Sequence, residues 1–249
     1  MDMSVTGARI YWTIPILGGI PITETVVNTW IIILLVTALC IFLTRGLKVH
    51  ATSRRQVIAE FLVNTARKFV DGNMGETFSY YTPFVASIFV LSALSSLSSL
   101  VGAYAPTSDL STLLGWALLV FVLITFTKVK TNGVLGYFKG YTQPIFVLTP
   151  FNIISEIATP ISMAFRHFGN IASGGVIMAL VYGALASLSR MVLGLLPGFL
   201  GDILGLIPIF QIGIPAILSV YFDLFSSFLQ AFIFCMLTMM YISSAAQEG

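Results

Sequence analysis

Five long apolar segments constrain this chain more than any other feature of its sequence. A bilayer core needs about 20 consecutive apolar residues in a helix, and a soluble globule needs more polar surface than this composition offers, with 57% hydrophobic and 9% charged residues. The sequence therefore predicts an all-α polytopic membrane protein with about five membrane segments in a single domain over 1–249. The segments cover approximately 26–45, 83–101, 112–127, 150–190 and 208–246.

The last two apolar segments are each roughly twice as long as a perpendicular membrane span requires. Helices of that length fit a bilayer only when they are strongly tilted. We therefore expect 83–127 to form a helical hairpin and 150–246 to form two long, strongly tilted helices. Prolines stand where these two helices would start or bend: Pro150, Pro160, Pro208 and Pro215.

The segment 52–70 has a different pattern. Apolar residues recur there at helical spacing, and charged residues occupy the opposite side of the helical wheel. This pattern predicts an amphipathic helix that lies in the membrane interface. The apolar side carries Ile58, Phe61, Leu62, Thr65 and Phe69, and the charged side carries Arg54, Arg55, Glu60, Arg67 and Lys68.

The basic residues predict the orientation in the membrane. Most of them fall in the two loops around 45–68 and 128–139, which lie on one side of the predicted topology, whereas Arg9 and Arg190 lie on the other. Loops rich in Lys and Arg stay in the cytoplasm. We therefore expect the amino terminus outside and the carboxyl terminus in the cytoplasm.

Composition also disfavours several classes of protein. A net charge of +2 without a basic, aromatic-rich patch argues against nucleic-acid binding. Cys40 and Cys235 both lie in apolar segments, so neither a disulfide framework nor a metal site is indicated, and we expect no cofactor. The first apolar segment follows about 25 mixed residues without a basic start, so we expect no cleavable signal peptide.

A polar stripe runs along the helix expected over 150–190. At about 100° per residue, six small polar residues fall within about 40° of Arg166, apart from any bend at Pro160. A second stripe lies on the last helix. The first stripe contains Asn152, Ser155, Thr159, Ser162, Asn170 and Ser173, and the second contains Ser219, Asp223, Ser227 and Gln230.

Three ionisable residues, Glu156, Arg166 and Asp223, therefore stand inside membrane segments. A charged Arg or Asp at mid-helix costs about 2.5–3.5 kcal/mol on an insertion scale, so such residues usually mark an ion or substrate pathway. A structural ion pair inside the bundle is the alternative. Arg166 has no carboxylate within one turn on its own helix, which favours a partner outside this chain.

His167 lies about 100° from the stripe and fits either a packing role or a functional one. A serine hydrolase built from Ser173 and His167 is disfavoured, because six residues on one helix point the two side chains about 120° apart. No internal repeat supports a secondary transporter. A stand-alone ion channel remains an alternative function.

Three stretches carry a resemblance to a known family: "IPITETVVNTWIIILL", "TPFNIISEIATPISMAFRHFGNIASG" and "QAFIFCMLTMMYIS". They resemble subunit a of the bacterial F-type ATP synthase, and the resemblance extends over nearly the whole chain. It implies a non-catalytic subunit that faces the ring of c subunits, alongside b subunits and the rest of the synthase. The compact amino terminus without a presequence favours a bacterial plasma membrane over an organelle. The resemblance also implies that Arg166 faces the ring, together with Asn170 and Gln230.

The same resemblance implies two offset half-channels for H⁺ or Na⁺. Glu156, with Ser155 and Asn152, would line the inner one, and Asp223 the outer one. Asp109 would stand at the outer mouth, although "SDLST" before an apolar run fits a helix N-cap equally well. Gly175 departs from the family pattern, because many relatives carry Glu or His there, so Asp223 would serve the outer channel alone.

Overall fold

The computed structural model describes residues 8–15, 19–48, 53–143, 145–193, 217–218 and 220–247. Five helical segments within these ranges are long and apolar enough to cross a membrane. This finding confirms the predicted all-α polytopic class. The five segments are Glu24–Thr44, Glu76–Val101, Leu110–Gly140, Phe146–Val192 and Val220–Gln247.

A small β-hairpin precedes the first helix, and the sequence analysis did not predict it. Strands β1 (Ile10–Ile14) and β2 (Ile20–Thr23) pair in antiparallel fashion. Their sequences, IYWTI and IPIT, are rich in β-branched and aromatic residues, which favour extended backbone. The backbone N–H of Glu24 donates to the carbonyl of Arg9 at 2.8 Å and joins the hairpin to the first helix.

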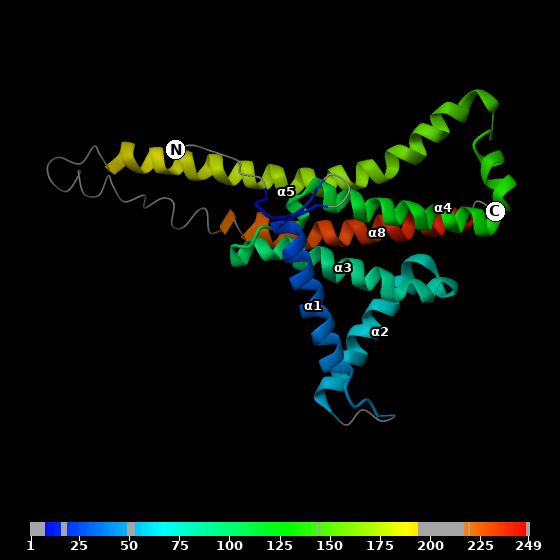
Figure 1. Ribbon diagram of the computed structural model, residues 1–249, viewed down its shortest axis with the longest axis horizontal. Helices are drawn as coiled ribbons and strands as arrows, with labels where there is room; N and C mark the ends of the chain where they lie inside the picture. The colour runs from blue at the N-terminus through cyan, green and yellow to red at the C-terminus, as the bar shows by residue number, and fades with distance from the viewer. Residues whose placement is uncertain are drawn as a thin grey trace.

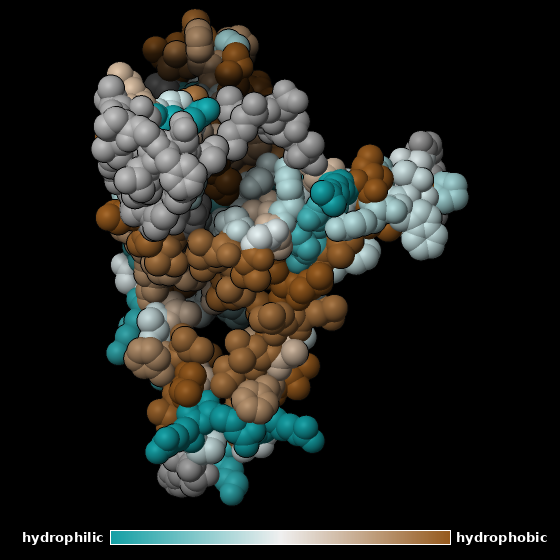
Figure 2. Space-filling model, turned by 90° about the vertical axis from the view of Figure 1, so that its left-hand side faces the viewer, coloured by the Kyte–Doolittle hydropathy of each residue, from teal (hydrophilic) through white to brown (hydrophobic). Residues whose placement is uncertain are grey.

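Helices α1 (Glu24–Thr44) and α2 (Arg54–Met74) form a V in Figure 1. Ser53 caps α2 by accepting from the backbone N–H of Gln56 at 3.3 Å. The guanidinium of Arg55 lies 5.1 Å from the ring centre of Phe42, so the two helices are in contact near the tip of the V. Figure 2 shows an apolar band above a hydrophilic lower end. The cations at the junction of α1 and α2 are exposed: Arg45, Lys48, Arg54 and Arg55.

The remaining helices run along the long axis of the molecule, and α1 runs across them (Figure 1). Helix α8 packs against both α3 and α4, and α5 packs mainly against α4. Buried apolar side chains fill the space between α3, α4 and α8, among them Val85, Ile88, Val120, Cys235 and Met239. In chain order the elements are η1 (Glu76–Tyr81), α3 (Thr82–Leu97), η2 (Ser98–Val101), η3 (Pro106–Ser108), α4 (Leu110–Gly140), η4 (Phe146–Leu148), α5 (Thr149–Leu193), η5 (Val220–Phe225) and α8 (Ser226–Gln247).

Helix α4 continues well past residue 127, where the sequence analysis placed the end of the hairpin. The expected loop from Lys128 onward is therefore largely helical. Hydropathy falls at Lys128, but a helix can continue beyond the apolar layer when long side chains carry their charge outward. The helix breaks at Gly133, whose φ of 70° and ψ of 168° lie in a region that residues with a Cβ rarely adopt.

Helix α5 is 45 residues long. At 1.5 Å per residue such a helix is roughly 68 Å long, about twice the thickness of a bilayer core. Pro160 lies inside α5 without ending it. Pro208, Pro215 and the expected start of the last long helix lie outside the described residues, and the described part of that helix begins with a π-helical turn, η5.

Candidate ion-translocation site

Arg166 lies on an exposed face of α5. Its neighbours Ala164 and His167 are buried, so α5 turns one side toward the rest of the chain and presents the arginine on the other. Arg166 makes no hydrogen bond or ion pair with any part of the chain that the structure describes. An arginine cannot lose its proton in a protein, so this face carries a permanent positive charge that has no counter-ion among the described residues.

Small residues surround the arginine along this face. Ser162, Gly169 and Ser173 are exposed, and a Cβ built at Gly169 would meet no atom within 4 Å. Asn170 is half-buried, and its side-chain amide donates to the hydroxyl of Ser226 at the start of α8. The sequence analysis did not select Ser226, because that serine lies off the predicted stripe of the last helix.

The second stripe does not keep the register that an ideal α-helix predicts. Residues Val220–Phe225 form a π-helical turn, which has more residues per turn than the 3.6 assumed from the sequence. Asp223 lies in this turn, but its side chain and all of Ser219 lie outside the described residues. Ser227 and Gln230, on α8, are both buried.

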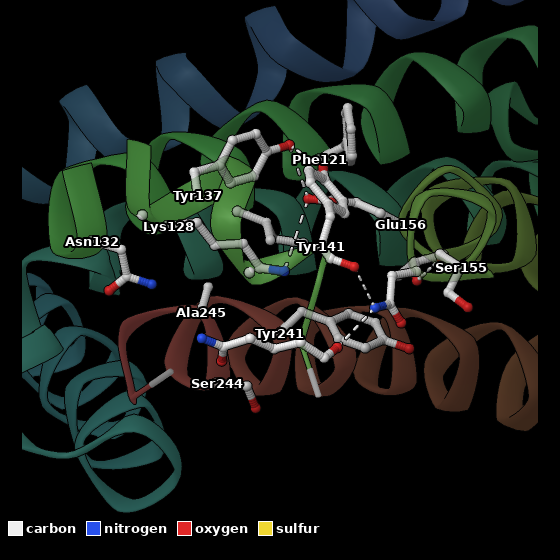
Figure 3. Close-up of a pocket in the computed structure, with 16 residues that line it drawn as sticks. Phe121, Lys128, Asn132, Tyr137, Tyr141, Ser155, Glu156, Tyr241, Ser244 and Ala245 are labelled. Carbon is white, nitrogen blue, oxygen red and sulfur yellow. Dashed lines mark hydrogen bonds and ion pairs between the residues drawn. The ribbon is translucent and has the colours of Figure 1, made fainter. Parts of the chain in front are cut away.

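A polar cavity of about 460 Å³ lies among α4, α5 and α8 (Figure 3). Glu156 of α5 stands in its wall, and the Nζ of Lys128 lies 3.9 Å from its Oε1. The hydroxyl of Tyr137 donates to the same oxygen at 3.3 Å, and the hydroxyl of Tyr141 donates to that of Tyr137 at 2.5 Å. A chain of hydroxyl groups therefore leads from the end of α4 to the carboxylate.

The kink at Gly133 gives the last part of α4 a new direction, and this part carries both tyrosines. Asn152 holds the end of α4 near α5, because its amide donates to the carbonyls of Tyr141 at 2.8 Å and Gln143 at 3.1 Å. Burial, and then hydrogen bonding with Glu156, raise the pKa of Tyr141 above its usual value. Its hydroxyl therefore remains a hydrogen-bond donor at neutral pH.

The cavity takes in only one end of the predicted stripe. Asn152, Ser155 and Thr159 line it, together with Glu156. Lys128, Tyr137 and Tyr141 are cavity residues that the sequence analysis missed, because it placed them in a loop and used the lysine only for orientation. The spacing of the two tyrosines, one helical turn apart, was the available signal.

Asp109 caps α4, as the alternative interpretation of "SDLST" held. Its Oδ1 accepts from the backbone N–H of Ser111 at 2.9 Å, and its Oδ2 accepts from the hydroxyl of Thr25 at 3.1 Å. The side-chain amide of Asn28 donates to the carbonyl of Tyr104 at 2.9 Å. These contacts join the start of α4 and the loop before it to the first turns of α1, far along the chain from the Glu156 cavity.

His167 is 1% exposed, and neither ring nitrogen has a partner within the described residues. Its ring packs edge-on against Phe234 of α8, with 6.1 Å between the ring centres. This environment fits a packing residue of the α5–α8 contact. The structure therefore separates His167 from the exposed face that carries Arg166.

The sequence matches the family model described as ATP synthase A chain over residues 26–243. That range includes nearly all of α1 and most of α8, the helices between them, Arg166 and Glu156. The chain belongs to the ATP synthase A chain family. Residues 1–25, which include the hairpin β1–β2 and the start of α1, and residues 244–249 lie outside the range that matches the A chain model.

Several A chain relatives match over nearly the full length. ATP synthase subunit a 1 of Chlorobaculum parvum is 30% identical over 233 residues, which are 92% of this chain and 91% of the relative. ATP synthase subunit a of Desulforamulus reducens is 32% identical, over 96% of this chain and 85% of the relative. The sodium-ion-specific subunit a of Propionigenium modestum is 29% identical, over 93% of this chain and 76% of the relative.

Proposed function

We propose that this chain is the non-catalytic, ion-conducting stator subunit of an F-type ATP synthase. In this proposal two offset half-channels carry H⁺ or Na⁺ to and from a rotating ring of c subunits, and the b subunits hold the chain in place. The protein lies in a bacterial plasma membrane with its amino terminus outside and its carboxyl terminus in the cytoplasm. The exposed cations at the α1–α2 junction support this orientation.

Arg166 is the observation that carries the proposal. It is exposed on a helix of membrane-spanning composition, and it has no carboxylate partner in the described chain. A permanent cation there attracts an emptied carboxylate on a neighbouring subunit and cannot itself carry a proton. It therefore separates two ion entries that would otherwise be connected.

The Glu156 cavity supports the inner half-channel. It is polar, it reaches about 460 Å³, and it lies among the helix ends that the orientation puts on the cytoplasmic side. On α5 its lining ends at Thr159, and Arg166 lies seven positions further along the helix, a rise of roughly 10 Å. An ion in the cavity is thus about two helical turns from the face where the ring would pass.

The outer half-channel is assigned to Asp223, with Asn170 and Gln230 near the ring and Asp109 toward the outer mouth. The link from Asn170 to Ser226 supports a close approach of α5 to the start of α8 at this level. Asp223 lies in a π-turn, and such turns are frequent at functional sites. The carboxylate would relay ions between the outer solution and the ring.

The membrane potential supplies enough energy for this coupling. One charge that crosses 100 mV releases about 2.3 kcal/mol, and several crossings add up for each nucleotide made. Both H⁺ and Na⁺ fit the proposal as cargo, and one relative is named as sodium-ion specific. ATP-driven transport measured with and without Na⁺ in the intact complex would identify the ion.

Replacement of Arg166 tests the central claim. We expect Arg166→Ala to abolish ion-driven ATP synthesis and to leave ATP hydrolysis by the detached soluble part unchanged. Arg166→Lys should be severely impaired, because an ammonium lacks the planar, forked N–H donors of a guanidinium group. Arg190→Ala is the matched control, because Arg190 is also exposed and on α5 but donates to the carbonyl of Ala186. Near-normal synthesis by Arg166→Ala would overturn the proposal.

A stand-alone channel is the competing function, and it predicts a different result. Such a channel would conduct ions when the purified chain is reconstituted alone. Two offset half-channels leave no continuous path without the ring. Ion flux through vesicles that contain only this chain would therefore favour the alternative.

A further inference from the structure

The hairpin β1–β2 has two chemically different faces. Its register pairs Trp12 with Ile22, Thr13 with Pro21, and Ile14 with Ile20. Because directly opposed residues share a face and successive residues alternate, Trp12, Ile14 and Ile22 lie on one face. The Thr13–Pro21 pair and, beyond a bulge, the Ile10–Thr23 pair lie on the other. One face of the hairpin therefore carries tryptophan and isoleucine, and the other carries both threonines together with Pro21 and Ile10.

Within this apolar face Ile14 and Ile22 are half-buried, whereas Trp12 is exposed. Trp12 is 72% exposed, although tryptophan has a large apolar surface to bury. Tyr11 and Ile10, which precede Trp12 at the bulge, are also exposed, each at 62%, and the exposed Arg9 directly precedes the strand. An exposed aromatic and aliphatic cluster of this kind indicates a surface that something else covers.

The position of the hairpin indicates what covers it. It directly precedes α1, whose length and exposed apolar surface are those of a membrane span, so it stands at the level where that span leaves the hydrocarbon. Figure 1 shows its strands running across the direction of α1. Tryptophan and tyrosine are enriched at this level because one part of the ring is apolar and another is polar.

We propose that the hairpin lies on the lipid surface, with Trp12 and Ile22 inserted at the boundary between headgroups and acyl chains. The lipid-exposed surface of α1 then continues into the apolar face of the hairpin. Arg9 is suited to a lipid phosphate, and Thr13 on the opposite face remains in water. The hairpin is a surface anchor, separate from the ion path.

The anchor has a mechanical consequence because the hairpin is held to α1. The N–H of Glu24 bonds to the carbonyl of Arg9 at 2.8 Å, and the hydroxyls of Thr23 and Thr25 lie 2.5 Å apart. Thr25 in turn donates to Asp109 at 3.1 Å. A hairpin that rests on the lipid surface therefore sets the depth of α1 and, through Asp109, the start of α4.

Site-specific photo-crosslinking tests the proposal in the intact synthase in native membranes. A benzophenone amino acid replaces Trp12 in one variant and Thr13 in a matched variant on the opposite face. After illumination, mass spectrometry of the chain separates lipid adducts from protein adducts. We expect lipid adducts at position 12 to exceed those at position 13 at least fivefold, without a protein adduct at position 12.

Other outcomes overturn the proposal. A protein adduct at position 12 would show that another subunit covers this face. Equal lipid yields at the two positions, or none at either, would show that the hairpin does not rest on the bilayer with the Trp12 face inward. ATP-driven pumping by both variants is measured in parallel, so that a failure to assemble is recognised and the readout does not depend on the proposed ion path.

Discussion

Arg166 and His167 are neighbours in sequence with opposite environments. The helix rotates by about 100° between them, which is enough to move a side chain from an open face to the α5–α8 contact. Arg166 is exposed and unpaired within the described chain, whereas His167 is 1% exposed against Phe234. The sequence left both a packing role and a functional role open for His167. Its burial favours the packing role.

The carboxylate of Glu156 has specific side-chain partners that its position in the sequence did not indicate. Its carboxylate faces Lys128 and accepts from Tyr137. We expect Glu156→Gln to slow ATP-driven pumping several-fold without uncoupling it, because Ser155 and Asn152 still line the water path. Glu156→Gln removes the negative charge that faces the partly buried ammonium of Lys128, which is energetically costly. The double variant Glu156→Gln/Lys128→Met should therefore recover part of the pumping rate.

Pumping rates of the single and double variants in membrane vesicles check this prediction. Glu76→Gln is the control, because Glu76 is an exposed acid outside the cavity. Complete uncoupling by Glu156→Gln, or an unchanged rate at every pH, would contradict the assignment of the cavity to the inner half-channel.

Among the elements, the broken helix α4 decides the shape of the cavity. Gly133 has a φ of 70° and a ψ of 168°, which only glycine adopts without strain, and the tyrosines follow this break. We expect Gly133→Ala to destabilise the kink by about 1–3 kcal/mol and to lower both pumping and the thermal stability of the complex. Gly183→Ala on α5, where a Cβ has open space and no positive φ, should leave both unchanged. Equal effects of the two substitutions would exclude backbone strain as the cause.

The adjacent glycines of α5 offer a second test between elements. A Cβ at Gly174 would lie 3.4 Å from Phe222 of η5, whereas a Cβ at Gly175 would meet no atom of the described residues within 4 Å. We expect the inlet to need one carboxylate, which either of its two walls can supply. Asp223→Asn should then strongly reduce ion entry from outside. The double variant Asp223→Asn/Gly175→Glu should recover part of the ion flux. Gly174→Glu should not restore it, because Gly174 is buried and its side chain would face Phe222 instead of open space.

The measurement is ATP-driven ion pumping by the wild type, by Asp223→Asn, and by Asp223→Asn combined with Gly175→Glu or with Gly174→Glu. Normal pumping by Asp223→Asn would make Asp223 a structural residue. A failing double variant that still assembles normally would contradict the idea that a relay can move between the two helices.

For the whole molecule, the packing is uneven. In the most apolar stretch of Phe146–Val192 only 6% of the residues are buried, compared with 44% in Val220–Gln247. Helix α5 therefore depends on surfaces outside this chain more than α8 does. We expect amides of 149–193 to exchange hydrogen at least tenfold faster than those of 226–247 in the isolated chain in detergent, and the difference to shrink in the intact synthase. Similar protection of both helices in the isolated chain would contradict this.

The sequence by itself determined the membrane class, the apolar segments and the exceptional position of Arg166. These depend on local hydropathy and on the cost of a charge in lipid, which can be judged residue by residue. It also determined the family, since the characteristic stretches are continuous in the chain.

Only the tertiary structure decided which polar residues meet. Lys128, Tyr137 and Tyr141 reach Glu156 because α4 continues past the apolar layer and breaks at Gly133, and hydropathy records neither event. The π-turn at Val220–Phe225 changes a register that a helical wheel assumes constant. The hairpin was missed because two short strands have little periodicity, and its pairing depends on contacts between segments. Backbone geometry at a few residues therefore set the details of the site that composition and spacing left open.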